Sequence, residues 1–271
     1  MSVRVRTVDA FTDQPFRGNP AGVIRLDDRP AGAGDEWYRA VARELNLSET
    51  AFLESYEGAD ADYRLRWFTP GAEVDLCGHA TLATAHCLFS DGLAGPIRFA
   101  TRSGVLTVRA AGDGGVIMDF PAQPPRPHPV PDWLPAAIGT TPSYYGGTES
   151  GFQLAVLADA QTVRQVQPDL ARIKRELSHG LIVSAVADAA DLDFVSRFFA
   201  PALAVPEDPV TGSAHTVLVP YWAERLGRLE LRAEQVSARG GRLGLRLSGD
   251  RVQLTGRAVT MIDGTLAIDP A

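Results

Sequence analysis

The stretch "DLCGHATLATAHC", residues 75–87, sets an acid, thiols, a glycine and two imidazoles around a run of small residues. From Gly78 to Phe89 nearly every position is small or apolar, so no polar face remains for solvent. This pattern is typical of a helix that is enclosed on all sides, as a helix inside a curved sheet would be. The stretch therefore predicts an enclosed helix whose first residues carry chemistry.

A metal site is one interpretation of this stretch. His79 and His86 share a helix face, but seven helical residues separate them by about 10 Å. One ion needs its ligand atoms within about 2 Å. We therefore expect no metal site, and we interpret His86 and Cys87 as buried structural residues. Cys77 and Cys87 are the only cysteines, and a disulfide between them would distort the helix, so we expect reduced thiols and a cytoplasmic location.

An anion site is a second interpretation. A helix that begins at Gly78 has free backbone N–H groups and the positive end of its dipole at that point. The glycine also lets a ligand approach the backbone closely. A small carboxylate would suit such a site. The alternative, in which the glycine only makes a tight strand-to-helix turn, stays open.

Composition excludes several classes of function. The 271 residues carry a net charge of −7 with scattered arginines, which argues against nucleic-acid partners. No stretch approaches the roughly 18 apolar residues of a membrane span, so no membrane partner is expected. Lys174, the only lysine, lies in a polar segment, which leaves no pocket lysine for a pyridoxal Schiff base and no P-loop. We expect no cofactor.

The chain repeats itself. Residues 66–81 and 197–216 both begin with Arg, an aromatic residue, Phe, any residue and Pro, and both end in the start of a small-residue helix. Residues 102–113 and 239–250 align without a gap. Two pairs in register indicate a duplicated domain. The duplication gives a second candidate anion site at Gly212 and Ser213.

The boundary between the copies is predicted near residue 123. The segment 124–135 contains six prolines in twelve residues, so it predicts a stiff linker rather than a helix or a central strand. The expected halves are 1–122 and 123–271, with a crossing of the final strand back to the first half left open. Short strands fill each half, and amphipathic helices are expected at 35–46 and 167–177. The fold class is α+β, with two pseudo-symmetric halves, each a barrel-like and mostly antiparallel sheet around a central helix.

Four segments carry a family resemblance: "VDAFTDQPFRGNPAGV" (8–23), "LNLSETAFL" (45–53), "RWFTPGAEVDLCGHATLATAH" (66–86) and "EDPVTGSAHTVLVPYWAERLG" (207–227). Together they resemble the phenazine-biosynthesis isomerase (PhzF-like) family, which has the diaminopimelate-epimerase fold. The resemblance covers essentially the whole chain. It implies two halves of the kind described above, a cofactor-free active site and a homodimer.

The resemblance also implies roles for individual residues. Epimerases of this fold use two cysteines as acid and base, but here Cys77 has Thr211 as its counterpart. A threonine hydroxyl is too weak an acid for this task, so two-thiol racemisation is not expected, and Cys77 is interpreted as a wall residue. The implied proton carrier is instead Glu49. His79 and Asp208 are the implied residues that orient the substrate and assist proton movement. The implied substrate-binding residues are Asn19, Gly78, Gly212 and Ser213.

Structural alternatives remain for several of these residues. Glu49 could be a surface acid, Asp208 a helix cap and Asn19 a turn residue. His215 is expected to be packed rather than catalytic. The expected function is a cofactor-independent isomerase that moves a proton between carbons of a small unsaturated or cyclic carboxylic acid, similar to trans-2,3-dihydro-3-hydroxyanthranilate isomerase. The alternatives are an amino-acid or hydroxy-acid epimerase of the same fold and a non-catalytic carboxylate-binding protein.

Overall fold

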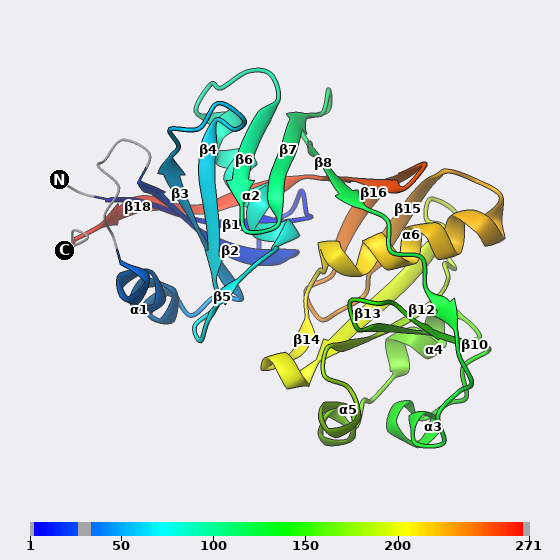
Figure 1. The fold of residues 1–271 in the computed structure, drawn as a ribbon. Coiled ribbons are helices and arrows are strands. Elements are labelled where there is room, and N and C mark those ends of the chain that lie inside the picture. The colour runs from blue at the N-terminus through cyan, green and yellow to red at the C-terminus, as the bar shows by residue number, and fades with distance from the viewer. Residues whose placement is uncertain (1–2, 27–33, 268–271) are drawn as a thin grey trace. The chain divides into compact units, whose positions relative to one another are not determined.

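The computed structural model describes residues 3–26 and 34–267, which form two compact units. Unit 1 runs to Asp119 and resumes at Thr255, and unit 2 comprises Phe120–Leu254. The chain leaves unit 1 along β8 (Val116–Pro121) and returns along β17 (Arg251–Gly256) (Figure 1). The sequence placed the boundary near residue 123, and the structure assigns the final strand to unit 1.

Unit 1 is built on one mixed sheet. Antiparallel pairs join β18 to β1, β1 to β2, β3 to β4, β6 to β7 and β7 to β8, and parallel pairs join β2 to β3 and β4 to β6. The further elements of this unit are β1 (Val3–Ala10), β2 (Asn19–Leu26), β3 (Glu49–Ser55), β4 (Tyr63–Phe68), β5 (Glu73–Val74), β6 (Ile97–Thr101), β7 (Gly104–Ala110), β18 (Ala258–Leu266), α1 (Asp35–Leu45) and α2 (Gly78–Ser90).

Helix α2 is the centre of unit 1. Every residue of α2 except His86, Phe89 and Ser90 is buried, and the helix contacts β1, β2, β3, β7 and β18. The sheet therefore curves around the helix, as its apolar sequence predicted. Thr81 and Thr84 satisfy their buried hydroxyls by donating to carbonyl oxygens one turn earlier, at 2.6 and 2.8 Å.

Unit 2 repeats this pairing scheme. The order of antiparallel and parallel pairs from β10 through β11, β12, β13 and β15 to β16 is the same as that from β1 through β2, β3, β4 and β6 to β7. The elements of unit 2 are β9 (Arg126–Pro127), β10 (Tyr144–Gly147), β11 (Phe152–Val156), β12 (Gly180–Val186), β13 (Phe194–Ala200), β14 (Val205–Asp208), β15 (Glu230–Gln235), β16 (Gly241–Ser248), α3 (Leu134–Ile138), α4 (Ala160–Gln165), α5 (Leu170–Glu176), α6 (Gly212–Leu226) and a 3₁₀ turn (Pro201–Leu203). The duplication inferred from two sequence pairs thus extends to strand topology.

Helix α6 takes the position in unit 2 that α2 has in unit 1. It is buried along most of its length and continues through Pro220 to its C-cap, Gly227, whose φ of 66° is one that glycine readily adopts. The Phe194 ring stacks between His215 and Trp222 of α6, with centroid distances of 6.0 and 5.8 Å.

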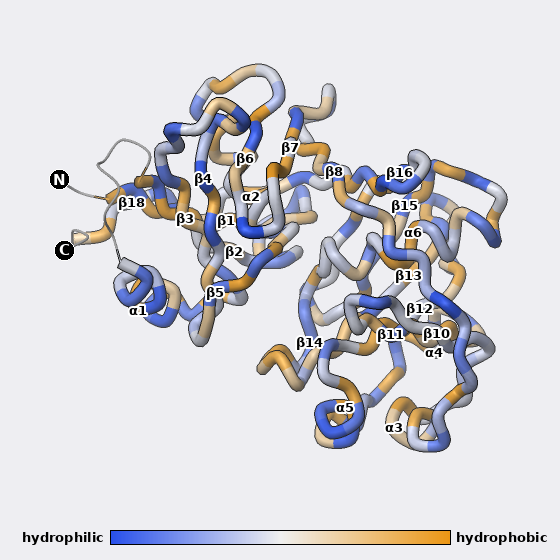
Figure 2. Tube along the Cα trace, in the orientation of Figure 1, coloured by the Kyte–Doolittle hydropathy of each residue, from blue (hydrophilic) through white to orange (hydrophobic). Residues whose placement is uncertain are grey.

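The remaining helices cover outer faces of the two sheets. Figure 2 shows hydrophilic and hydrophobic residues alternating along α1 and α5, as expected of helices with one buried stripe. Helix α1 begins where predicted and ends one residue earlier, at Leu45, because Asn46 is its C-cap. Helix α5 begins later than predicted because Asp169 caps it, accepting from the Arg172 N–H at 2.9 Å. Among the described residues, no helix is both long and apolar enough to cross a membrane.

The prediction that residues 124–135 contain no helix is wrong at their C-terminal end. Helix α3 begins at Leu134, so Pro135 lies in its first turn. Proline is tolerated there because the N–H that it lacks would have no acceptor within the helix. The earlier prolines border the short strand β9, which pairs with β10.

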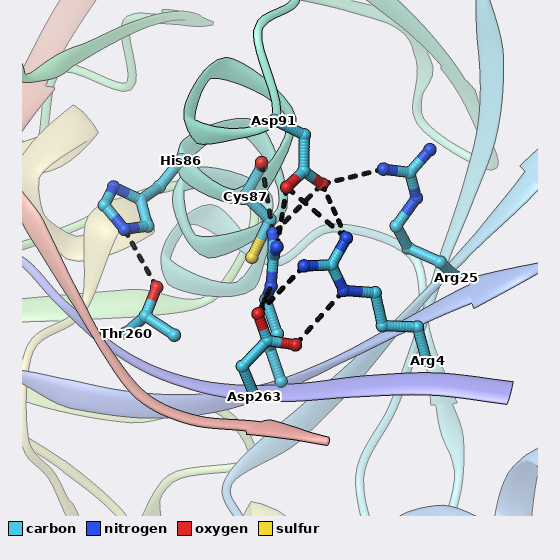
Figure 3. Close-up of polar contacts among 8 residues, drawn as sticks. Arg4, Arg25, His86, Cys87, Asp91, Thr260 and Asp263 are labelled. Atoms are coloured by element: carbon cyan, nitrogen blue, oxygen red, sulfur yellow. Dashed lines mark hydrogen bonds and ion pairs between the residues drawn. The ribbon is translucent and has the colours of Figure 1, made fainter. Parts of the chain in front are cut away.

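An ion network fixes the C-terminal end of α2 to the sheet (Figure 3). Arg6 is buried, donates to Asp91 at 2.6 Å and to the Cys87 carbonyl at 3.2 Å, and also contacts Asp263 of β18 at 3.0 Å. Arg4 and Arg25 contact the same Asp91. Burial alone would raise the pKa of Asp91, but the hydrogen bonds and charges of these arginines outweigh it and lower that pKa.

We predict that Gly256→Ala destabilises the protein by about 1–3 kcal/mol, because overpacking of a dense core has this cost. A Cβ atom at Gly256 would lie 2.5 Å from a Phe11 ring carbon and 2.6 Å from a Leu82 methyl carbon, and both side chains are fully buried. Gly264→Ala is the control, because a Cβ there meets nothing within 4 Å. Urea unfolding measures both, and equal midpoints would contradict the packing described here.

We predict that Asp91→Asn lowers the free energy of unfolding by about 2 kcal/mol, since the buried Arg6 loses its charged acceptor. The control is Asp188→Asn, whose partner Arg164 is exposed, and there the change should be much smaller because solvent screens the pair. Because the folded-state pKa of Asp91 is lowered, its contribution is present above the unfolded pKa of about 3.9 and disappears as the pH falls further. The acid limb of the stability profile should therefore be flatter in Asp91→Asn, and parallel limbs would count against the network.

Candidate functional site

Sheet register brings the predicted unit 1 residues together. Strands β2 and β3 are parallel, with Ala21 opposite Glu49, so their N-terminal ends lie side by side. Asn19 begins β2, Glu49 begins β3, and Gly78 begins α2, which packs against both strands. Residues distant in sequence thus meet where three elements start.

His79 lies at the centre of this group. It is 4% exposed, and its Nε2 atom is 3.2 Å from Oε2 of Glu49, close in distance but not aligned as a hydrogen bond. Its Nδ1 atom is 3.3 Å from the Asn19 amide nitrogen and 3.5 Å from the Cys77 sulfur. Burial lowers the pKa of His79 to about 3, so the ring is neutral near pH 7.

A hydrogen-bond relay fixes which ring nitrogen carries the proton. Ser48 donates to Oδ1 of Asn19 at 3.3 Å, which turns the Asn19 amide N–H toward Nδ1 of His79. Nδ1 is therefore the acceptor, and the proton is on Nε2, facing the Glu49 carboxylate. Ser48 was not predicted as a site residue, although it stands beside Glu49 in "LSET".

Cys77 belongs to the same group. It is the N-cap residue of α2, it is buried, and its sulfur is not part of a disulfide bond. Ligand atoms of Glu49, Cys77 and His79 all lie within 4.8 Å of one another, so these three side chains could hold a metal ion. The sequence argument against a metal considered only His79 with His86, and it did not consider this set.

The unit 2 residues form a second group at the start of α6. Asp208 ends β14 and accepts from the Thr211 hydroxyl at 2.5 Å. Gln235 of β15 donates to the Asp208 carbonyl at 2.7 Å and accepts from the Thr211 N–H at 2.9 Å. The interpretation of Asp208 as the helix cap is not what the structure shows, since Thr211 is the N-cap. No sequence motif indicated Gln235.

Both helix starts leave backbone donors for a ligand. At Cys77 and at Thr211, the N-cap side chain makes no capping hydrogen bond to its own helix. The Thr211 hydroxyl, which could have capped α6, is directed to Asp208 instead. N–H groups at Gly78 and Gly212 are thus suited to a carboxylate, and their role in substrate binding stays a prediction.

His215 is a structural residue, in agreement with the sequence. It is fully buried, and its Nδ1–H donates to the Thr211 carbonyl at 2.8 Å. Burial lowers its pKa to about 4 despite that hydrogen bond. His215 is therefore protonated at Nδ1, whereas His79 is protonated at Nε2.

The acid of unit 1 has no counterpart in unit 2. The parallel pair of β11 and β12 begins with Phe152 opposite Gly180. The equivalent pair in unit 1, β2 and β3, begins with Ala21 opposite Glu49, so Gly180 is the equivalent of Glu49. A Cβ at Gly180 would lie 2.4 Å from the Phe198 ring, which fills the space of a side chain there. By the same repeat, Ser213 stands in the place of His79. The two units therefore share a helix start but differ in their side-chain chemistry.

Comparisons with known proteins show the class to which this fold belongs. The phenazine biosynthesis-like protein (PhzC-PhzF) family model matches residues 8–264. An uncharacterized isomerase of Pseudomonas aeruginosa is 50% identical over 98% of this chain and 99% of its own, and one of Halalkalibacterium halodurans is 43% identical over 99% and 100%. A PhzF-family structure from Enterococcus faecalis is 40% identical, with a TM-score of 0.91, and covers 99% of this chain and 100% of that one.

A more distant structure shows the fold alone. A hydroxyproline epimerase from Agrobacterium vitis is 14% identical, with a TM-score of 0.63, and covers 99% of this chain and 93% of its own. The chain belongs to the PhzC-PhzF family, and it is an isomerase with the diaminopimelate-epimerase-like fold.

We predict that nitrogen NMR of the histidine rings shows His79 protonated at Nε2 and His215 protonated at Nδ1. Neither ring should titrate between pH 8 and 5, because burial lowers both pKa values to about 3 and about 4. Below the unfolded pKa of about 6.5, these histidines bind protons in the unfolded chain but stay neutral in the folded protein. Both residues therefore make the free energy of unfolding decrease as the pH is lowered. A ring that titrates near pH 6.5 would contradict its burial.

Proposed function

We propose that the protein is a cofactor-independent isomerase that moves a proton between two carbons of a small unsaturated or cyclic carboxylic acid, with Glu49 as the proton carrier. One observation carries this proposal: the Glu49 carboxylate lies 3.2 Å from a neutral, buried His79 at the edge of the sheet where α2 begins. A base, an oriented N–H and a helix start suited to a carboxylate therefore lie together.

The mechanism needs a single base. Glu49 removes a proton from a carbon that is activated by a conjugated system, and it returns that proton to another carbon on the same face. The Nε2–H of His79 lies 3.2 Å from the carboxylate, and a small realignment lets it donate to Glu49 and hold it in position between the two transfers. The Ser48–Asn19 pair keeps Nδ1 of His79 unprotonated, so the ring proton is on Nε2. The nitrogen that faces Glu49 is therefore a donor and not a lone pair.

Within unit 1, backbone N–H groups at Gly78 bind the substrate carboxylate. The helix start of unit 2, at Gly212 and Ser213 with Asp208 nearby, is likewise suited to polar groups of a substrate. The family's description as phenazine biosynthesis-like supports a ring acid such as trans-2,3-dihydro-3-hydroxyanthranilate as the first compound to test. A biosynthetic role in the cytoplasm and a homodimer belong to the same proposal.

A specific observation favours one alternative, an epimerase. Cys77 lies 3.5 Å from His79 and could act as a second proton carrier beside Glu49. The two reactions differ in their products. An isomerase moves a double bond and changes ultraviolet absorbance, whereas an epimerase changes only optical rotation.

We predict that the native protein converts trans-2,3-dihydro-3-hydroxyanthranilate in heavy water with a change in absorbance, and that Glu49→Gln lowers kcat by at least about 100-fold. Loss of a general acid–base group typically costs about 10²–10⁴-fold. Glutamine keeps the shape of the side chain but cannot carry the proton. Mass spectrometry measures deuterium uptake into substrate and product alongside the absorbance.

The matched control is Glu57→Gln, since Glu57 is an exposed acid outside the site and should not affect turnover. Full activity in Glu49→Gln would show that another residue is the base. If the native protein leaves this acid unchanged but inverts a chiral carbon in a panel of amino and hydroxy acids, the epimerase replaces the isomerase. Thermal stabilisation by carboxylates without any turnover would instead identify a binding protein.

A further inference from the structure

Glu49, Cys77 and His79 are three side chains that can each bind a metal ion, whereas the proposed one-base proton transfer uses only Glu49 and His79. The thiol has no role in that mechanism, yet its sulfur lies 3.5 Å from Nδ1 of His79. We propose that these three side chains bind one thiophilic divalent cation of the Zn²⁺ class, and that this site inhibits the enzyme rather than serving its reaction.

The sulfur and the imidazole nitrogen already have the right separation. Zn²⁺ binds thiolate sulfur at about 2.3 Å and histidine nitrogen at about 2.0–2.1 Å, and a tetrahedral angle then separates the two ligand atoms by about 3.5 Å. Cys77 and His79 show that separation without an ion. The ion would take the place of the Asn19 N–H at Nδ1, a contact of 3.3 Å.

Glu49 completes the set with a small movement. A tetrahedral site needs its carboxylate oxygen about 3.4–3.6 Å from the other two ligand atoms. One ligand atom from each of the three residues lies within 4.8 Å of the other two, so the carboxylate has to approach by up to about 1.4 Å. The Glu49 side chain is 16% exposed, which leaves the carboxylate more room than the buried thiol and ring.

The ligand types select the ion. One thiolate, one imidazole and one carboxylate suit borderline-soft ions such as Zn²⁺, Co²⁺ and Cd²⁺, whereas Mg²⁺ and Ca²⁺ require oxygen ligands. Three protein ligands leave one position for water, as in open zinc sites. We therefore expect binding of Zn²⁺ and Co²⁺ but not of Mg²⁺.

Inhibition follows because the ion occupies the lone pairs of Glu49. A carboxylate that is bound to a cation cannot remove a proton from carbon, and an occupied Nδ1 no longer receives the Asn19 N–H. This consequence rests on the proposed function. The binding itself does not, so it is tested separately.

The test is a titration of the full-length protein with Co²⁺, followed by thiolate-to-cobalt charge-transfer absorption. Residues 86 and 87 supply matched controls, a half-buried histidine and a buried cysteine on the same helix. We expect the band in the native protein, in Cys87→Ser and in His86→Gln, and its loss in Cys77→Ser. No band in the native protein, or a band that survives in Cys77→Ser, overturns the proposal.

Calorimetry with Zn²⁺ then tests the other two ligands. Glu49→Gln and His79→Gln should each weaken Zn²⁺ binding by at least about tenfold, since loss of even an outer-shell partner costs about 10–100-fold. Unchanged affinity in either variant removes that residue from the site and overturns the three-ligand proposal. Circular dichroism confirms that each variant is folded.

Turnover forms a separate arm of the test. Zn²⁺ should inhibit isomerisation at the concentrations that saturate the calorimetric site, and Cys77→Ser should be inhibited at least about tenfold more weakly. Inhibition that is equal in Cys77→Ser and the native protein overturns the inhibitory role. If the native protein isomerises nothing, the proposed function fails while the cobalt and zinc results still decide whether the site exists.

Discussion

The enclosure of α2 is the constraint on which the rest of unit 1 depends. Its side chains are small and apolar, so strands can pack against almost its whole circumference. Only the two ends of such a helix retain backbone groups in need of partners. At the C-terminal end, Arg6 and Asp91 supply them. At the N-terminal end the N-cap side chain makes no capping hydrogen bond, and the candidate site lies there.

Duplication gave the protein two such helices, but the repeat is faithful only in its backbone. The pairing order of the strands is the same in both units, because it is what encloses a helix. Side chains at equivalent places have diverged, since Phe198 packs against Gly180 where the first unit has Glu49. Unit 2 keeps a polar helix start, held by Asp208, Thr211 and Gln235. The backbone arrangement was thus retained, while the candidate acid–base residues Glu49 and His79 occur in unit 1 alone at these equivalent positions.

Much of this architecture could be predicted from the sequence. The apolar run after Gly78 depends on local periodicity, and α2 begins where the sequence placed it. Strand β2 is hard to recognise from the sequence because its "NPAG" start has the composition of a turn. The site was harder to predict than the fold. Cys77 and Glu49 are 28 positions apart, and only the parallel register of β2 and β3 and the packing of α2 bring them together. Gln235 lies in a strand with no motif, so nothing local could have indicated it.

The return of the chain from unit 2 to unit 1 has a consequence for biosynthesis. Strand β18 pairs with β1 from Val3 to Ala10, and Asp263 contacts Arg4 and Arg6. During translation, the edge of β1 that pairs with β18 therefore stays open until β18 has been made, although β2 already pairs with the other edge, whereas every strand from β9 to β16 is made in one continuous stretch. Unit 2 can complete its fold on the ribosome first, and unit 1 exposes an unpaired edge until then. Chaperones that shield strand edges would accordingly matter most for the first half of the protein to be synthesised.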